Sequence, residues 1–181
     1  MNIKQFAFLP KSFLFLHFVF LCTSTASFAQ KNILPSDSIF IFGQIKQKLV
    51  LTTTELEKLP KSPIKNQIIT NHKGEIKDTL VNIKGVALKV LLKDLSFTYQ
   101  KPKELNEFYI VLTATDNYRV VISWNELFNA PGGADFYIIT EMNGKPLNQL
   151  KERMLLIAAS DIQTGRRYVK GLKQIEVKRL E

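Results

Sequence analysis

The C-terminal third of the chain decides the fold: it contains Asn143-Gly144-Lys145-Pro146-Leu147, the apolar run 154–159, and Gly165-Arg166-Arg167-Tyr168-Val169-Lys170-Gly171-Leu172-Lys173-Gln174-Ile175-Glu176-Val177. Asn-Gly is a preferred dipeptide of two-residue type I′ hairpin turns. The apolar run is typical of a buried strand. The last segment predicts a basic loop around residues 165–171, followed by a strand over 174–178 that closes the sheet.

Strand signals dominate the rest of the chain. β-Branched and aromatic residues occur in short runs bounded by turn-forming residues, which indicates strands. Asn71-His72-Lys73-Gly74 separates two such runs and predicts a hairpin with Gly74 at positive φ. The run 118–122 is expected to pair antiparallel with 108–114. The predicted strands before Asn143 span residues 38–43, 48–52, 67–70, 79–81, 108–114, 118–122 and 136–140.

Three short helices are expected beside these strands. Thr54 with Glu57, and Ser123 with Glu126, have the spacing of capping boxes and predict helices over 55–59 and 124–128. The apolar residues of 86–92 recur at helical spacing and predict a helix that covers a sheet face. The fold class is therefore α+β, with strand-dominated mixed sheets and short helices. Residues 30–181 are enough for a single domain.

Residues 1–29 have the pattern of a cleaved secretory signal. Lys4 and Lys11 form a positive n-region, 13–21 is the apolar h-region, and Ser27-Phe28-Ala29 is a cleavage site. Cys22 suggests a lipoprotein, but no small residue precedes it. We expect cleavage after Ala29, export to the periplasm or the medium, and no transmembrane anchor afterwards. A retained N-terminal anchor is the alternative, although the run is short for a membrane helix.

Composition limits the chemistry of the exported chain. Cys22 is the only cysteine and leaves with the signal, so the rest has no disulfide, thiolate ligand or cysteine nucleophile. The chain carries 25 Lys+Arg against 16 Asp+Glu, a net charge of +9, which attracts anions. The lysines are spread along the sequence and do not alternate with stacking aromatics. We therefore expect no nucleic-acid partner.

The residues with chemical potential are few. His72 is the single histidine after the signal and lies on the predicted hairpin tip, too little for a zinc site or a Ser-His-Asp triad. No pair of carboxylates indicates an acid/base couple. Arg166, Arg167 and Lys170 place three cations within five residues, and they suit a phosphate or a pterin edge. A solvated basic hairpin is the alternative.

The order and spacing of several short segments resemble the molybdopterin-binding domain of sulfite-oxidase-type oxidoreductases. The resemblance implies that fold, and it implies that Arg167 and Lys170 lie against the pterin phosphate. It runs from about Gly43 to Val177 and rests on Leu49-Val50-Leu51-Thr52, Lys84-Gly85-Val86-Ala87-Leu88, Ala114-Thr115-Asp116-Asn117-Tyr118, Trp124-Asn125-Glu126-Leu127, Asn143-Gly144-Lys145-Pro146-Leu147, Arg167-Tyr168-Val169-Lys170-Gly171-Leu172 and Ile175-Glu176-Val177.

The chain departs from that family at its metal ligand. Members have a molybdenum-binding cysteine after the strand that matches 67–70, where this chain has Asn71-His72. The family's histidine before the Gly-x-Pro is Asn143, and its tryptophan after Lys170 is Gly171. The resemblance thus implies a short exported member that lacks the metal-ligand cysteine.

Three functions remain open from the sequence. The first is a domain without redox catalysis that binds molybdopterin, or another small anion, at Arg166, Arg167 and Lys170. The second is a molybdenum-dependent oxidoreductase with non-thiolate ligands such as His72 or Asn71. The third is a cofactor-free interaction module of the envelope that uses the loop 129–134 or a sheet edge.

Overall fold

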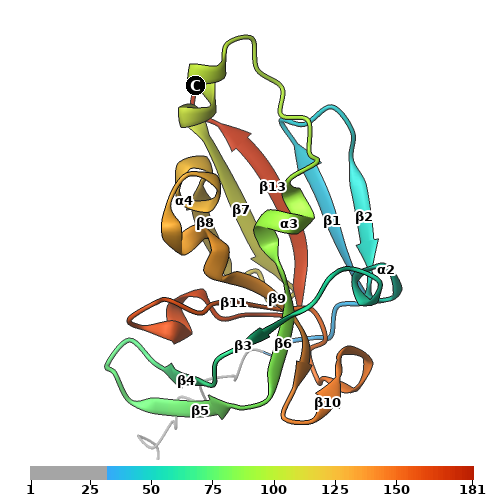
Figure 1. Ribbon diagram of the computed structural model, residues 1–181, viewed down its shortest axis with the longest axis vertical. Helices are drawn as coiled ribbons and strands as arrows, with labels where there is room; N and C mark the ends of the chain where they lie inside the picture. Colours follow the sequence, from blue (N-terminus) through green and yellow to red (C-terminus); the bar gives the residue numbers. More distant parts are fainter. Residues whose placement is uncertain (1–31) are drawn as a thin grey trace, which may run out of the picture. The chain divides into compact units, whose positions relative to one another are not determined.

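A five-stranded mixed sheet is built around the last strand of the chain (Figure 1). The computed structural model describes residues 32–181, and the predicted signal segment lies outside them. The strand order is β2 (Leu49–Thr52), β1 (Ser38–Gly43), β13 (Leu172–Arg179), β7 (Phe108–Ala114) and β8 (Arg119–Ser123). β13 pairs parallel with β1 and antiparallel with β7, so the last strand lies at the centre of the sheet. The predicted antiparallel pairing of 118–122 with 108–114 is confirmed.

A second sheet is entirely antiparallel. Its order is β12 (Val169–Lys170), β11 (Leu155–Ala158), β9 (Phe136–Met142), β6 (Ile83–Ala87) and β3 (Ser62–Ile64), and β10 (Lys145–Pro146) also pairs with β9. Asn143 and Gly144 join β9 to β10 with φ of 54° and 73°, which confirms the predicted type I′ turn. The strands β4 (Gln67–Thr70) and β5 (Ile76–Leu80) form the separate predicted hairpin, with Gly74 at φ 81°.

The helices are short. They are α2 (Thr53–Glu57), α3 (Leu88–Leu92) and α4 (Trp124–Phe128), with 3-10 segments η1 (Pro102–Glu107), η2 (Pro131–Asp135), η3 (Leu147–Gln149) and η4 (Thr164–Arg167). The Ser123 cap of α4 is confirmed, since its hydroxyl accepts from the Glu126 N–H at 3.0 Å.

Two helix predictions need correction. α2 begins two residues early, because Thr52 forms the capping box with Glu55 where β2 ends. Both Thr52 with Glu55 and Thr54 with Glu57 have the spacing of a capping box. The first pair forms it, because β2 ends at Thr52. The predicted helix over 86–92 covers only Leu88–Leu92. Val86 and Ala87 belong to β6, because β9 supplies their backbone hydrogen bonds.

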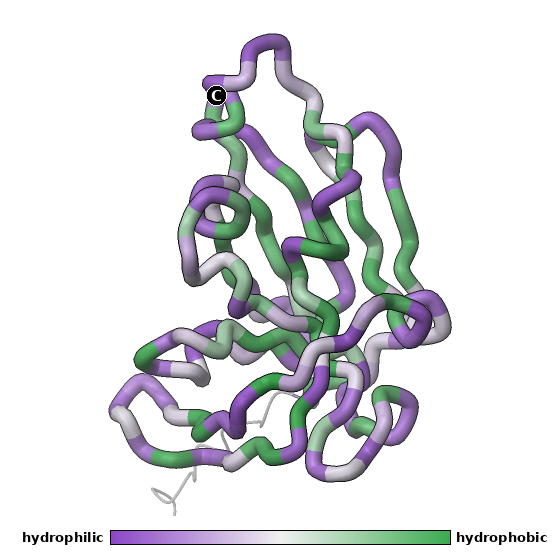
Figure 2. Tube along the Cα trace, in the orientation of Figure 1, coloured by the Kyte–Doolittle hydropathy of each residue, from purple (hydrophilic) through white to green (hydrophobic). Residues whose placement is uncertain are grey.

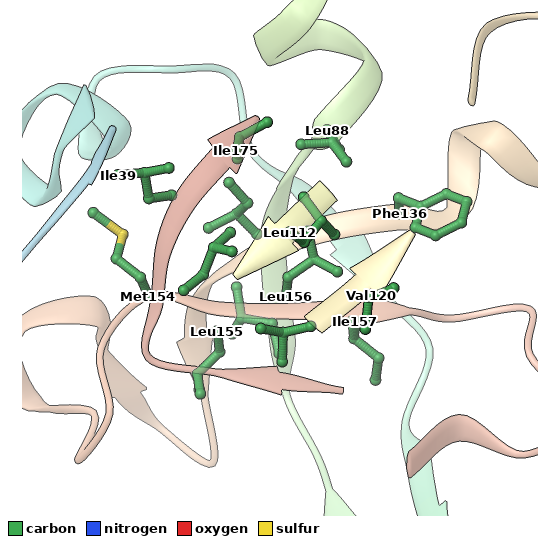
Figure 3. Close-up of a cluster of buried hydrophobic side chains, with 14 of the residues drawn as sticks. Ile39, Leu88, Leu112, Val120, Phe136, Met154, Leu155, Leu156, Ile157 and Ile175 are labelled. Atoms are coloured by element: carbon green, nitrogen blue, oxygen red, sulfur yellow. The ribbon is translucent and has the colours of Figure 1, made fainter. Parts of the chain in front are cut away.

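The core unites both sheets. Hydrophobic residues follow the strands and polar residues the turns (Figure 2). Figure 3 shows buried side chains of the five-stranded sheet beside those of β11, β9 and α3, and beside Met154 just before β11: Ile39, Leu112, Val120 and Ile175 with Leu155, Leu156, Ile157, Phe136 and Leu88. The α+β class with strand-dominated mixed sheets is thus confirmed. Within residues 32–181, no helix has the length and hydrophobicity needed to cross a membrane.

Candidate functional site

The basic loop predicted from the sequence packs directly on the end of β4. The Thr164 hydroxyl donates to the Ile68 carbonyl at 2.6 Å and accepts from the Thr70 N–H at 3.2 Å. Gly165 is so close that a Cβ there would overlap the Thr70 carbonyl oxygen. We call this contact of η4 with β4 the η4–β4 joint. It brings the basic loop beside the β4–β5 hairpin that carries Asn71 and His72.

Arg167 is enclosed by carboxylates. Its Nε donates to Asp161 at 2.7 Å, a second nitrogen donates to the other Asp161 oxygen, and the third donates to Glu126 of α4. The guanidinium lies 4.7 Å from the Phe136 ring centroid. The hydrogen bonds that Arg167 donates to Asp161, and the one it donates to Glu126, raise the pKa of Arg167 above its ordinary value against the opposing effect of burial. We call these residues the Arg167 cluster; its two carboxylates and one guanidinium sum to a charge of −1.

The other two cations have different partners. Arg166 is exposed, its Nε donates to the Gln163 side chain at 2.7 Å, and it forms no ion pair within residues 32–181. The Lys170 ammonium lies 4.0 Å from a Glu152 carboxylate oxygen and 5.1 Å from the Tyr168 ring centroid. The structure therefore keeps Arg166, Arg167 and Lys170 on one short segment but gives each its own set of neighbours. Their role in binding an anion stays a prediction.

Asn71 and His72, which the sequence resemblance sets at the position of a metal-binding cysteine, lie in a turn whose polar groups are hydrogen-bonded. The Asn71 side-chain oxygen accepts from the Lys73 and Glu75 N–H groups at 2.9 and 3.0 Å, and its amide nitrogen donates to the Glu75 carboxylate at 2.8 Å. His72 is exposed on the hairpin tip. In the described part of the chain, no three His, Cys, Asp or Glu residues are grouped to hold a metal ion. These residues do not fit a molybdenum centre of the family's thiolate type.

Asn143 connects two turns through its side chain and its backbone. Its side-chain oxygen accepts from the Val81 N–H at 2.9 Å, and its own N–H donates to the Val81 carbonyl at 2.8 Å. Its φ of 54° is one that asparagine tolerates better than most residues. Asn143 therefore links the β9–β10 turn to the connection between β5 and β6.

Tyr168 is a buried member of the basic loop that sequence reasoning did not single out. It is 8% exposed, and its hydroxyl lies 3.9 Å from the Met142 sulfur. Burial, and then the negative charges of Glu152 and Asp78, raise the pKa of Tyr168 above its ordinary value of 10.0. Because the folded-state pKa is raised, the neutral phenol stabilises the fold fully below about pH 10, and this stability is lost as the pH rises further.

Replacing Tyr168 by phenylalanine should remove that alkaline dependence. The free energy of unfolding of the wild type, relative to Tyr168→Phe, should be constant below about pH 10 and fall above it. Urea unfolding of both proteins over this range measures the difference. Tyr99→Phe is the matched control, because Tyr99 is 42% exposed, and its curve should parallel the wild type. Parallel curves for Tyr168→Phe would contradict the assignment.

Sequence reasoning also missed a cavity. Four cavities are described on residues 32–181, and none of the four is lined by Arg166, Arg167 or Lys170. The largest of them measures about 540 Å³ and lies between residues 93–99, which follow α3, and η1 and α4. Its lining comes from segments far apart in the sequence, so no local motif could have indicated it.

Comparisons with known proteins agree with the fold. No family model and no curated protein sequence matches this chain. Its structure is similar to the crystal structure of the sulfane dehydrogenase SoxCD from Paracoccus pantotrophus, with a TM-score of 0.57 and 17% sequence identity. The similarity covers 80% of this chain but only 39% of that one. At this identity it shows the fold alone, and it confirms the predicted sulfite-oxidase-type architecture.

Proposed function

We propose that this protein is an exported binding domain that has kept the sulfite-oxidase-type fold without its molybdenum redox chemistry. The observation that carries the proposal is the Arg167 cluster. By the sequence resemblance, Arg167 matches a residue that lies against the pterin phosphate. Here its donors are directed at Asp161 and Glu126.

The charge of the cluster opposes a phosphate at Arg167. Like charges repel most strongly where they are partly removed from water, and the Asp161 side chain is only 13% exposed. A phosphate would have to displace the carboxylate from a two-point contact with the guanidinium, which is the strongest geometry for such a pair. Arg167 is thus a structural cation that ties η4 to α4.

The missing thiolate supports the same proposal. Cysteine is a soft anionic ligand, and the neutral amide of Asn71 does not replace it. The Asn71 oxygen and nitrogen are also committed to the turn between β4 and β5. Ligation by His72 would rest on one exposed side chain.

Molybdenum analysis tests the proposal. The chain is expressed with its signal in a host that makes the cofactor in molybdenum-rich medium, and an authentic molybdenum enzyme is purified in parallel as the loading control. We expect far less than one molybdenum per chain by elemental analysis, and pterin fluorescence after oxidation reports separately whether a metal-free pterin is bound. Stoichiometric molybdenum in the purified protein would overturn the proposal.

The candidate ligand of this domain is a metal-free pterin or another phosphate-bearing anion. The observation that favours it is the exposed Arg166, which has no carboxylate partner within residues 32–181, with Lys170 four residues along the same segment. If it binds, the double variant Arg166→Gln, Lys170→Gln should weaken pyrophosphate binding at least about tenfold, because each charged hydrogen bond contributes about 1.5–3 kcal/mol. Isothermal titration measures this, with Lys73→Gln as the control. An unchanged affinity would remove the basic loop as an anion site.

Export is the remaining part of the proposal. The signal pattern of residues 1–29 supports it. Cell fractionation followed by intact-mass measurement should find a protein that begins at Gln30 in the periplasm or the medium. A full-length protein retained in the cytoplasm would contradict export.

A further inference from the structure

The 540 Å³ cavity lies beside two chain segments, 44–46 and 96–98, that are joined by backbone hydrogen bonds. The Lys46 N–H donates to the Ser96 carbonyl at 2.9 Å, and the Thr98 N–H donates to the Gln44 carbonyl at 3.0 Å. Residues from the segment 93–99, which follows α3, line it together with Lys46, Leu105 of η1, and Trp124 and Phe128 of α4. In Figure 1, α3 and α4 lie on the same side of the five-stranded sheet. The volume is in the range of small-molecule sites, about 300–1,000 Å³.

One wall of the cavity is aromatic and held in place. The Phe97 ring meets Phe128 edge-on at 6.0 Å between centroids, and Trp124 lies 5.4 Å from Phe128. Phe97 also contacts Phe108, which is 1% exposed and belongs to the core. Since each ring is fixed by its neighbours, the cavity offers ring surfaces that are arranged before a ligand arrives.

The charged side chains that line the cavity are all positive. Lys46 and Lys93 line it, and no carboxylate is among the described lining residues. Neither ammonium forms an ion pair within residues 32–181. Glu104, the acid beside the lining residue Leu105, is directed at Arg179, 2.9 Å away. Two cations that form no ion pair in the described part of the chain, beside an aromatic wall, attract an anion.

We propose that this cavity binds a small organic carboxylate that carries a flat ring, with the ring against Trp124 and the carboxylate facing Lys46 and Lys93. A neutral ring would gain nothing from the lysines, and a simple inorganic anion nothing from the aromatic wall. The site is separate from the basic loop, so the inference does not rest on the proposed function.

Trp124 provides a local reporter, because it is the only tryptophan of the chain. In the ¹⁵N-labelled mature protein its indole N–H gives a single side-chain signal in the NMR spectrum. The probes are naphthalene-2-carboxylate, the neutral naphthalene-2-methanol, and acetate. We expect a saturable shift of the Trp124 signal with the carboxylate, and at least about tenfold weaker binding of the alcohol and of acetate, since one hydrogen bond to a charged group contributes that much.

Substitutions of the lysines separate charge from ring contact. Lys46→Gln with Lys93→Gln should reduce affinity for the carboxylate about tenfold or more and leave affinity for the alcohol unchanged. Lys73→Gln on the β4–β5 turn changes the net charge without touching the cavity and should change neither affinity. No saturable shift of the indole signal, equal affinities for carboxylate and alcohol, or equal effects of the cavity and control variants would each overturn the proposal.

Discussion

Replacing Arg167 by alanine is expected to lower the free energy of unfolding by about 2–4 kcal/mol. The change leaves Asp161 and Glu126 facing each other without a cation, and Asp161 is only 13% exposed. It also removes the guanidinium from the Phe136 ring. The cluster is partly open to solvent, which places the effect below that of a fully buried pair. Urea unfolding of the mature protein measures it.

A second substitution tests whether charge is the cause. Adding Asp161→Asn to Arg167→Ala should recover about 1 kcal/mol or more relative to the sum of the single effects, because it removes one of the two unpaired carboxylates. Arg166→Ala, on the neighbouring exposed residue, is the control and should change stability by less than about 0.5 kcal/mol. If Arg167→Ala were as mild as Arg166→Ala, the cluster would not stabilise the fold and its cation would be available to a ligand.

Gly165→Ala is expected to be of similar severity, with a loss of about 3 kcal/mol. The new Cβ would overlap the Thr70 carbonyl oxygen, which is backbone and has no rotamer with which to move away. η4 would then have to separate from β4, and Thr164 would lose its hydrogen bonds to Ile68 and Thr70. Thermal and urea unfolding both report the loss.

Gly132→Ala is the matched control for this substitution. A Cβ at Gly132 would have the Ser160 hydroxyl oxygen as its nearest neighbour, at an ordinary contact distance of 3.6 Å. We expect a change within about 0.5 kcal/mol. Equal losses for the two alanines would mean that the η4–β4 joint yields easily, and that its close packing does not hold the basic loop in place.

Much of the fold could be predicted from the sequence, because local signals and pairing agree in this chain. The Asn143-Gly144 turn and the Ser123 cap depend on adjacent residues, and both appear as predicted. The predictions are wrong where pairing with a segment distant in the sequence determines the secondary structure. Val86 has helical spacing with Val90, but its backbone hydrogen bonds to β9 make it part of a strand. β13 occupies the centre of its sheet because β1, from the start of the domain, pairs beside it.

The candidate site was less predictable, because contacts between residues distant in the sequence determine it. Sequence proximity groups Arg166, Arg167 and Lys170, but the contact that defines Arg167 comes partly from Glu126, 41 residues away. The sequence could not indicate whether that guanidinium faces a ligand or a carboxylate. The aromatic cavity was hidden entirely, because Lys46, Lys93 and Trp124 meet only in the folded chain.

Native mass spectrometry tests the central claim, that this chain keeps the fold and has no molybdenum cofactor, most directly. The exported protein is purified from a host that makes molybdopterin and from an otherwise identical host that cannot. The account predicts the mass of residues 30–181 in both samples and no species that carries molybdenum. A heavier species found only in the cofactor-producing host, with the added mass of the molybdenum complex of the pterin, would contradict it.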